Sequence, residues 1–292
     1  MTNNQQNLIS VLMPVYKTDI ETLKETIQSV LDQTYENFEF LIVDDCPSDT
    51  REDLVKSFND PRIKYSINKT NLGISPTRNK LLSMAKGQFI AILDHDDLCD
   101  KTRFKKEIDF LEKNTMYGAV SCNYQLIPAK TDVIQPKDSE EIKTKLFETM
   151  PMLHSGMMIR TSILRKYNIE YRESFSPCED YMLCIELANC TMLYNIQENL
   201  MYYRDAPNNT TNTRKQLMID RDASCKDYLL SHYPYRYGLY KNIMEMNAQA
   251  KYQRVVQVKT FMGIKLATLK YQNNHVYVYL FGLIKIMSIR LS

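Results

Sequence analysis

Short apolar runs alternate with amphipathic stretches over the first 115 residues. The runs predict four buried strands, which cover residues 8–15, 38–45, 62–68 and 88–93. The stretches between them place apolar residues at helical spacing on one face. Because strands that alternate with helices of this length form βαβ units, the pattern predicts a parallel sheet flanked by helices.

Polar residues and a proline mark where the predicted helices begin. Thr18, with Glu21 three positions later, has the spacing of a capping box. Ser48 or Asp49 is placed to cap the second helix. Pro76 falls in the first turn of the third, where a missing N–H costs no hydrogen bond.

The alternation becomes irregular after the apolar run at residues 117–127. Residues 128–144 are polar and predict a connection. Residues 154–164 predict a strand followed by a helix, and another helix is expected to begin near Glu179.

The expected domain organisation follows from these changes. We expect a catalytic domain over residues 1–212, with a donor-binding half at 8–115 and an acceptor-side half at 116–212. A turn-rich segment at 204–214 closes it. Residues 213–292 are expected to form a helical region followed by a basic, apolar tail.

The overall composition is that of a globular cytoplasmic protein. Of 292 residues, 44% are hydrophobic and 25% charged, and a formal net charge of +2 gives no case for a nucleic-acid partner. The seven cysteines are scattered without a CxxC pair, which disfavours zinc and a disulfide framework and suits a reducing compartment. The first residues lack the pattern of a secretory signal, and no apolar run reaches the ~18 residues of a membrane span.

Three carboxylates and an imidazole follow the fourth predicted strand, in the order Asp94, His95, Asp96 and Asp97. Because the carboxyl ends of parallel strands meet at one edge of a sheet, these acids are expected to converge with Asp45, which ends the second run. Carboxylate oxygens are hard ligands that suit Mg²⁺ or Mn²⁺. A solvated Asp-rich turn has the same composition, so the acids alone leave both interpretations open.

Several motifs occur in a fixed order over residues 8–115. They read ISVLMPVYK, SVLDQTYENFEFLIVDD, NLGISPTRNKLL and QFIAILDHDD. Together they resemble the inverting glycosyltransferases of family 2. The resemblance implies a GT-A fold, an α/β architecture with a mostly parallel nucleotide-binding sheet flanked by helices. It also implies a nucleotide-sugar donor and a divalent cofactor, Mn²⁺ or Mg²⁺, at an Asp-x-Asp type motif.

The same resemblance implies donor-site roles residue by residue. Arg78 would lie near the pyrophosphate. Asp96 and Asp97 match the metal and ribose motif, with Asp97 the more direct metal ligand. The base pocket would be lined by Pro14, Val15 and Tyr16, and Asp45 would accept the uracil N3–H. His95 departs from the family pattern, which commonly has a small residue there, and we assign it no metal role.

The second half resembles the acceptor side of the same family. LHSGMMIRTSILRKY places His154 at the start of an acceptor segment, and SPCEDYML matches a Glu-Asp motif, with Asp180 as general base and Glu179 as its neighbour. A base is needed because a sugar hydroxyl has a high pKa and attacks poorly while it keeps its proton. A structural histidine and an acid pair at a helix N-terminus are the competing interpretations.

The tail from residue 251 carries Lys and Arg but no Asp or Glu, and contains the related segments FMGIKLATLK and LFGLIKIMSIR. Similar endings occur in bacterial enzymes that extend lipopolysaccharide and related glycans. Basic residues beside aromatic and aliphatic ones suit an anionic membrane surface, which predicts a peripheral location on the inner face of the cytoplasmic membrane. Packing on the catalytic domain and a contact between copies remain open, as does the oligomeric state.

These observations predict an inverting glycosyltransferase. It would move a sugar from a UDP-sugar to a hydroxyl of a growing lipopolysaccharide or other cell-envelope glycan, so that the acceptor is a glycan or glycolipid. A protein-linked or capsular glycan is an alternative acceptor. A nucleotidyltransferase also uses paired acids, but the segment after the first strand lacks a Gly-rich basic loop. The retained Asp45, Asp97 and Asp180 disfavour a non-catalytic binding module.

Overall fold

The computed structural model describes residues 7–206 and 213–233, residues 238 and 240–242, and the backbone of four strands between residues 256 and 290. The chain divides into two compact units, Met1–Leu229 and Leu230–Ser292. The division lies C-terminal to the boundary expected at residue 212.

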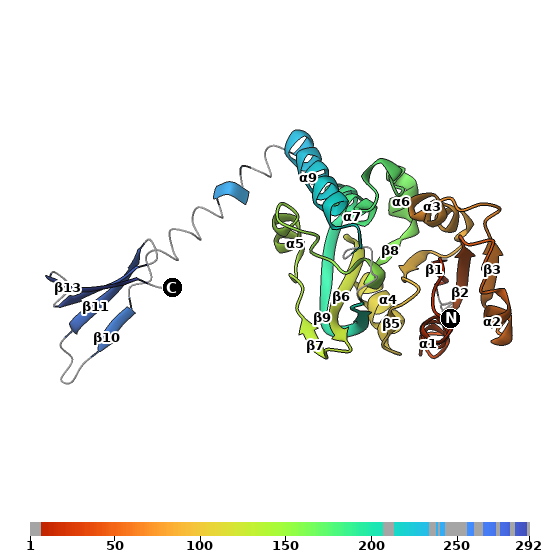
Figure 1. Cartoon of the computed structure of the whole chain (residues 1–292), viewed down its shortest axis with the longest axis horizontal. Helices are drawn as coiled ribbons and strands as arrows, with labels where there is room; N and C mark the ends of the chain where they lie inside the picture. The colour runs from red at the N-terminus through yellow and green to blue at the C-terminus, as the bar shows by residue number, and fades with distance from the viewer. Residues whose placement is uncertain are drawn as a thin grey trace. The chain divides into compact units, whose positions relative to one another are not determined.

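The N-terminal half of the first unit is a parallel sheet, as predicted. Its strands follow the four apolar runs: β1 (Ile9–Val15), β2 (Phe38–Asp44), β3 (Ile63–Ile67) and β4 (Phe89–Ile92). β1 pairs in parallel with β2 and β4, and β2 pairs in parallel with β3. The carboxyl ends of these strands therefore meet at one edge of the sheet, and β1, β2 and β3 lie side by side in Figure 1.

Helix α1 (Ile20–Leu31) begins at a different cap from the predicted one. The Asp19 carboxylate accepts a hydrogen bond from the Thr22 N–H at 3.0 Å, which makes Asp19 the N-cap. The prediction of a Thr18–Glu21 capping box is therefore wrong. An Asp carboxylate caps a helix as well as a Thr hydroxyl does, so spacing alone did not separate the two.

The next two helices differ in how well their starts were predicted. α2 (Glu52–Ser57) begins after Arg51 without a side-chain cap, so the assignment of its cap to Ser48 or Asp49 is wrong. The Asp49 carboxylate instead accepts hydrogen bonds from the Arg51 guanidinium. α3 (Ile74–Met84) has Pro76 in its first turn, as predicted.

The rest of the first unit extends the same sheet with mixed pairing. The added strands are β5 (Leu98–Cys99), β6 (Tyr117–Ile127), β7 (Thr131–Val133), β8 (Met158–Arg160) and β9 (Met192–Arg204). Over the described residues the nine-stranded sheet runs β3-β2-β1-β4-β8-β6-β9-β5, with β7 paired to β6. β8 is antiparallel to β4 and β6, whereas β9 is parallel to β6. The mostly parallel α/β architecture is confirmed.

Helices and short 3₁₀ turns cover this second half of the sheet. They are α4 (Arg103–Lys113), α5 (Ser139–Lys145), η1 (His154–Gly156), α6 (Thr161–Tyr167), η2 (Glu173–Phe175) and α7 (Glu179–Cys190). The strand followed by a helix, β8 and α6, and the helix that begins at Glu179 confirm the predictions for those segments.

The polar segment 128–144 is more ordered than predicted. It contains β7, which pairs antiparallel with β6, and most of α5. The Asp138 carboxylate caps α5 by accepting the N–H groups of Glu140 and Glu141. The interpretation as a plain connection is therefore wrong, because a short edge strand and a capped helix need few apolar residues.

Most of helix α9 (Lys215–His232) belongs to the first unit, where its Cys225 and Leu229 are both buried. The second unit contains an antiparallel sheet in the order β10 (Val256–Lys259), β11 (Lys265–Gln272), β12 (His275–Leu280) and β13 (Ile284–Arg290). Residues 207–212, in the predicted loop, and residues 234–237, 239 and 243–252, in the predicted helical region, lie outside the described residues. Over the described part of the chain, no helix is long and apolar enough to cross a membrane.

Candidate active site

The sheet edge brings the predicted donor residues together. Val15, at the end of β1, pairs with Asp44, and its carbonyl accepts the Asp45 N–H at 2.8 Å. Leu12 of β1 pairs with Ile92, two residues before Asp94. The buried Pro14 and Val15 thus lie beside the start of both acidic segments. Tyr16, just beyond the strand, is 44% exposed.

Asp45 organises the segment that precedes α3. Its carboxylate is 4% exposed and accepts hydrogen bonds from the Asn68 side chain and from the Leu72 and Gly73 N–H groups, each at 2.8 Å. Gly73 adopts a φ of 86°, which favours glycine. Asp45 therefore fixes the backbone that leads into the helix carrying Arg78.

Asp97 is the most enclosed acid of the turn Asp94–Asp97, at 1% exposure. One of its oxygens, Oδ2, accepts a hydrogen bond from the Ser155 hydroxyl, and Oδ1 accepts the Arg204 N–H at 3.0 Å. The Arg204 side chain donates from Nε to the Asp96 carbonyl at 2.9 Å. The end of β9 and the η1 segment therefore hold the acidic turn from two sides.

The acidic turn carries negative charge that its surroundings do not fully compensate. Burial, together with the charges of Asp96 and Asp94, raises the pKa of the Asp97 carboxyl well above its usual value. Burial and the Asp94 charge also raise the pKa of Asp96, although the neighbouring His95 opposes this. A bound cation would relieve this repulsion.

The donor set of the turn fits a hard divalent cation that is shared with phosphate. Within the described residues, no group of three or more His, Cys, Asp and Glu is arranged to hold a metal ion. Mg²⁺ and related ions in nucleotide sites commonly take only one or two carboxylates, and phosphate oxygens complete the shell. Asp96, which is half-buried, and Asp97 are the two carboxylates that could serve in this way.

Arg78 connects the acidic turn to the acceptor half. This nearly buried side chain donates from Nη2 to Asp94 and from Nη1 to Glu179, both at 2.7 Å. Burial disfavours its charge, but Asp94 and Glu179 outweigh that and raise the pKa of Arg78. Burial likewise opposes ionisation of Asp94, yet Arg78 and His154 hold the pKa of Asp94 below its usual value. These charges form one network, which is buried except at the partly exposed Asp94.

His154 lies at the centre of this network. Its Nε2 is 3.0 Å from the Tyr171 hydroxyl, and its Nδ1 is 4.0 Å from Asp94 Oδ2. The ring is 6% exposed, and Nδ1 has no hydrogen-bond partner among the described residues. The Arg78 guanidinium also lies over the Tyr171 ring, 5.4 Å from its centroid. Tyr171 thus orders two of the predicted site residues.

Asp180 and Glu179 occupy the first turn of α7. The Asp180 carboxylate accepts the Tyr181 N–H at 2.7 Å, and burial raises its pKa above the usual value, although the His154 charge opposes the shift. Glu179 is 4% exposed and uses Oε1 for Arg78, while its Oε2 has no hydrogen-bond partner in the described part of the chain. A carboxylate with a raised pKa has the properties of a general base.

Sequence reasoning missed four residues that support the site: Asn68, Ser155, Tyr171 and Arg204. Ser155 stands beside His154 in the quoted acceptor segment, so that motif held a usable signal. The others are single polar residues in ordinary contexts, and their roles depend on contacts between distant segments.

Sequence comparison identifies the family. The family described as Glycosyl transferase family 2 matches this chain over residues 10–169, more than half of its length. An uncharacterized glycosyltransferase of Methanocaldococcus jannaschii is 32% identical over 206 residues, which cover 68% of this chain and 70% of that protein. The Escherichia coli UDP-Glc:alpha-D-GlcNAc-diphosphoundecaprenol beta-1,3-glucosyltransferase WfgD is 40% identical over 123 residues, 41% of this chain and 47% of that protein.

Solved structures agree on the fold. S. aureus TarS in complex with UDP-GlcNAc superposes with a TM-score of 0.61 at 20% identity, over 70% of this chain and 60% of that chain. The mannosyltransferase PcManGT from Pyrobaculum calidifontis, in complex with GDP-Man and Mn²⁺, gives 0.58 at 16% identity, over 85% and 76%. The sequence match and the shared fold together establish that the chain belongs to glycosyl transferase family 2 and is a glycosyltransferase with the GT-A fold.

Proposed function

We propose that this glycosyltransferase moves a hexose from a UDP-sugar to a hydroxyl of a cell-envelope glycan, with inversion at the anomeric carbon. One observation carries the proposal: the ion pairs of Arg78 with Asp94 and Glu179 join the acidic turn to the start of α7. A donor held at the acidic turn would then have its sugar within reach of an acceptor beside Asp180.

In the proposed reaction Asp180 is the general base. It takes the proton of the acceptor hydroxyl, whose oxygen attacks the anomeric carbon from the face opposite the leaving UDP. One displacement with one base inverts the configuration. The raised pKa of Asp180 supports this role, because a carboxylate with a higher pKa is a stronger base. His154 and Glu179 are proposed to border the acceptor.

The donor is proposed to occupy the sheet edge. Asp96 and Asp97 would hold Mn²⁺ or Mg²⁺, which, when bound, offsets the negative charge that develops on the departing diphosphate. The uracil would lie near Pro14, Val15 and Tyr16. Asp45 retains capacity for the uracil N3–H, since a carboxylate oxygen can accept two hydrogen bonds and its Oδ2 accepts one, from Gly73.

The names of similar proteins support the donor and acceptor classes. WfgD uses UDP-Glc and a diphosphoundecaprenol-linked GlcNAc by its name, and TarS was solved with UDP-GlcNAc. TuaG of Bacillus subtilis, 36% identical over 110 residues, is named a putative teichuronic acid biosynthesis glycosyltransferase. We therefore propose a lipid-linked glycan of the lipopolysaccharide type as acceptor.

A donor screen tests the proposed function. We expect slow, metal-dependent hydrolysis of one among UDP-Glc, UDP-Gal, UDP-GlcNAc and UDP-GalNAc, measured as UDP release with Mn²⁺ and with EDTA. Asp96→Asn and Asp97→Asn should each remove this activity, whereas Asp32→Asn, at an exposed carboxylate that ends α1, should not. Full activity in excess EDTA would contradict the metal assignment. Turnover of GDP-Man alone would overturn the uridine assignment.

The second unit is proposed to contact an anionic membrane surface. The strand registers align Val276, Val278 and Leu280 of β12 with apolar residues on both neighbouring strands: Ala267, Leu269, Tyr271, Ile284, Met287 and Ile289. From residue 251 the sequence combines aromatic and aliphatic residues with Lys and Arg and contains no Asp or Glu, and this composition favours an anionic lipid surface.

Vesicle sedimentation tests the membrane proposal on the whole chain. The protein should pellet with phosphatidylglycerol vesicles at low salt and be released at high salt. Neutralising four basic residues of the strands should weaken this binding, since each contributes about 1 kcal/mol: Lys265, Lys270, Lys285 and Arg290. Replacing four lysines of the first unit provides the matched control. Full-length protein that stays in the supernatant at low salt would contradict the proposal.

A further inference from the structure

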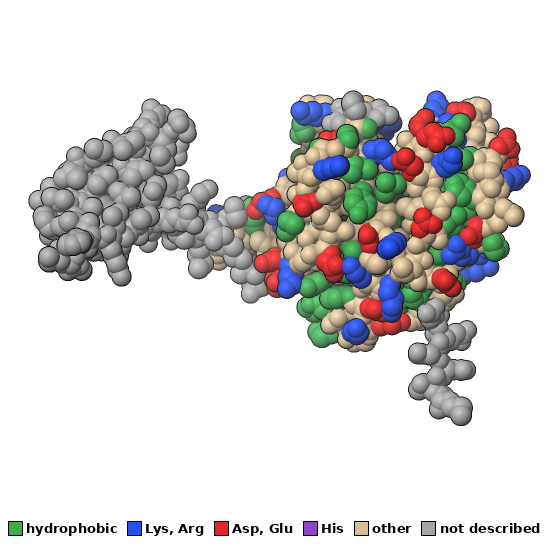
Figure 2. Space-filling model, turned by 90° about the horizontal axis from the view of Figure 1, so that it is seen from below, with side chains coloured by type: hydrophobic (Ala, Val, Ile, Leu, Met, Phe, Trp, Pro, Cys, Tyr) green, Lys and Arg blue, Asp and Glu red, His purple; other side chains and the backbone are tan. Residues whose placement is uncertain are grey.

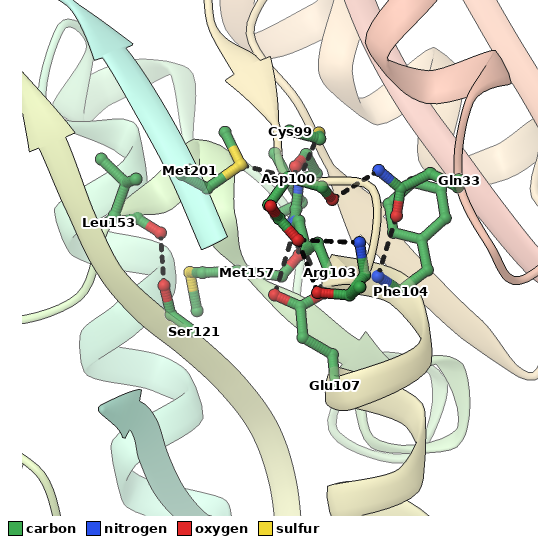
Figure 3. Close-up of polar contacts among 12 residues, drawn as sticks. Gln33, Cys99, Asp100, Arg103, Phe104, Glu107, Ser121, Leu153, Met157 and Met201 are labelled. Carbon is green, nitrogen blue, oxygen red and sulfur yellow. Dashed lines mark hydrogen bonds and ion pairs between the residues drawn. The ribbon is translucent and has the colours of Figure 1, made fainter. Parts of the chain in front are cut away.

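Arg103, the first residue of α4, is wholly buried beneath the acidic turn and has no part in the proposed chemistry. Figure 3 shows its guanidinium among side chains and carbonyls from several elements. Nε donates to both oxygens of Glu107, at 3.1 and 3.2 Å. Glu107 is equally buried, so the two form an ion pair shielded from water.

The remaining donors of Arg103 reach two backbone carbonyls. Nη2 donates to the Ile92 carbonyl at 3.0 Å and to the Met157 carbonyl at 3.3 Å. The Ile92 N–H also donates to the Met157 carbonyl, at 2.9 Å. Arg103 therefore holds the end of β4 against the chain that leaves η1.

The other terminal nitrogen of Arg103 contacts two sulfur atoms. Nη1 lies 3.3 Å from Cys99 Sγ and 3.2 Å from Met201 Sδ. Cys99 belongs to β5, just after the acidic turn, and Met201 belongs to β9, three residues before Arg204. β5 begins directly after the acidic turn, and β9 pairs with it.

All four segments that Arg103 contacts lead directly to groups of the site. Ile92 is two residues before Asp94, and Cys99 is two residues after Asp97. Met157 is two residues after Ser155, which donates to Asp97. Met201 leads to Arg204, whose N–H also donates to Asp97.

A second hydrogen bond fixes the η1 segment at its N-terminal end. The Ser121 hydroxyl of β6 donates to the Leu153 carbonyl at 2.9 Å, as Figure 3 shows. Leu153 directly precedes His154, so the segment is fixed on both sides, by Ser121 before it and by Arg103 after it. Movement at Arg103 would therefore alter the spacing between His154–Ser155 and the acidic turn.

We infer that Arg103 is a positioning residue that sets the spacing between the acidic turn and the His154–Ser155 segment. The inference rests on the proposed function, because it assumes that these two segments act on the same donor and acceptor. A rigid support of this kind matters because a misplacement of about 1 Å can cost on the order of 10²-fold in rate. Lysine cannot replace it, since a single ammonium does not present a planar fork to groups on two sides.

The test replaces both charges together. Substituting a buried ion pair by apolar residues of similar volume is often neutral for folding, so Arg103→Met with Glu107→Leu removes the support without leaving an unpaired charge. We expect the double variant to melt near the parent temperature while kcat for metal-dependent sugar transfer falls by roughly 10- to 100-fold. Mn²⁺-dependent UDP binding, measured by calorimetry, gives a readout that is independent of turnover.

The same helix offers a matched control. Lys105 and Asp109 form an exposed pair with the same i,i+4 spacing, at 2.6 Å. Lys105→Met with Asp109→Leu should keep parental kcat. A similar fall in kcat for both double variants would overturn the inference, as would a kcat within twofold of the parent for the buried one.

Two further variants keep the test decisive. If the buried double variant does not fold, Arg103→Lys should fold and lose about tenfold in kcat, and a kcat within twofold of the parent would overturn the inference. Glu107→Gln should keep near-parental kcat, because it retains an acceptor for Nε and leaves the two carbonyl contacts in place. A parent chain that does not bind UDP with Mn²⁺ would instead contradict the proposed function.

Discussion

Asp180→Asn is expected to bind UDP-sugar with nearly parental affinity and to transfer the sugar about 10²- to 10⁴-fold more slowly, the usual contribution of a general base. The amide keeps the oxygen that accepts the Tyr181 N–H, so the start of α7 should retain its geometry. It cannot take a proton from the acceptor hydroxyl. Single-turnover kinetics with bound donor, together with calorimetric donor affinity, measure the two quantities separately.

Asp53→Asn is the matched control for this substitution. Asp53 is the second residue of α2, as Asp180 is of α7, so both changes remove one carboxylate from the first turn of a helix. The control should leave the rate unchanged. Loss of donor affinity with a preserved rate in Asp180→Asn would make Asp180 a binding residue and place the base elsewhere.

The pH dependence of kcat/KM should report the same group. Burial raises the pKa of Asp180 above its usual value, and the base works only when deprotonated. As the pH is lowered, kcat/KM should therefore begin to fall at a higher pH than it would if the base were an aspartate of ordinary pKa. The profile of Asp180→Asn should lack this acid limb, and an unchanged limb would assign it to another group.

Local patterns were sufficient for the parallel half of the fold. Strands β1 to β4 are short apolar runs with helices between them. This alternation of strands and helices is enough to indicate that the carboxyl ends of the strands lie at one edge of the sheet. The segment 128–144 was not predictable in the same way, since β7 has three residues and gains its order from pairing with β6. Its one usable signal was Asp138 ahead of two glutamates, the composition of a helix N-terminus.

The sequence could propose residues for the candidate site but not the network of contacts among them. Sequence order and resemblance singled out Asp45, the acidic turn and Asp180 as candidates. They could not indicate that Asp97 is almost wholly buried, since that depends on Ser155 and on the end of β9. Surface charge is also mixed rather than segregated: Figure 2 shows acidic and basic side chains interspersed over one face of the first unit, in keeping with the near-neutral composition.

The link between Arg78 and Glu179 joins residues 101 positions apart, and no local pattern reports such a contact. It adds a linking role to the one that the resemblance implies for Arg78, which is a place near the pyrophosphate. Both terminal nitrogens of its guanidinium already donate to carboxylates, one in each half of the site. Arg78 therefore links the acidic turn to the start of α7, which a surface arginine that only binds phosphate would not do.

Arg78→Met should consequently be among the most damaging single substitutions in the chain. It leaves the Glu179 side chain, at 5% exposure, and the Asp94 side chain, at 29%, without their counter-charge. Removing one partner of a buried ion pair costs about 3–5 kcal/mol of unfolding free energy, which in a domain of this size lowers Tm by roughly 6–20 °C.

Sugar transfer should be lost in Arg78→Met along with stability, and differential scanning calorimetry together with UDP release measures both effects. Arg62→Met is the control: its pair with Asp60 is partly exposed, and the expected cost is at most about 1 kcal/mol. Adding Glu179→Gln to Arg78→Met should recover part of the Tm but not the activity, because the added change removes one unpaired charge and restores no link between the halves. A Tm for Arg78→Met within a degree of the parent would mean that Glu179 and Asp94 are neutral in the folded protein, and the charged network would then be wrong.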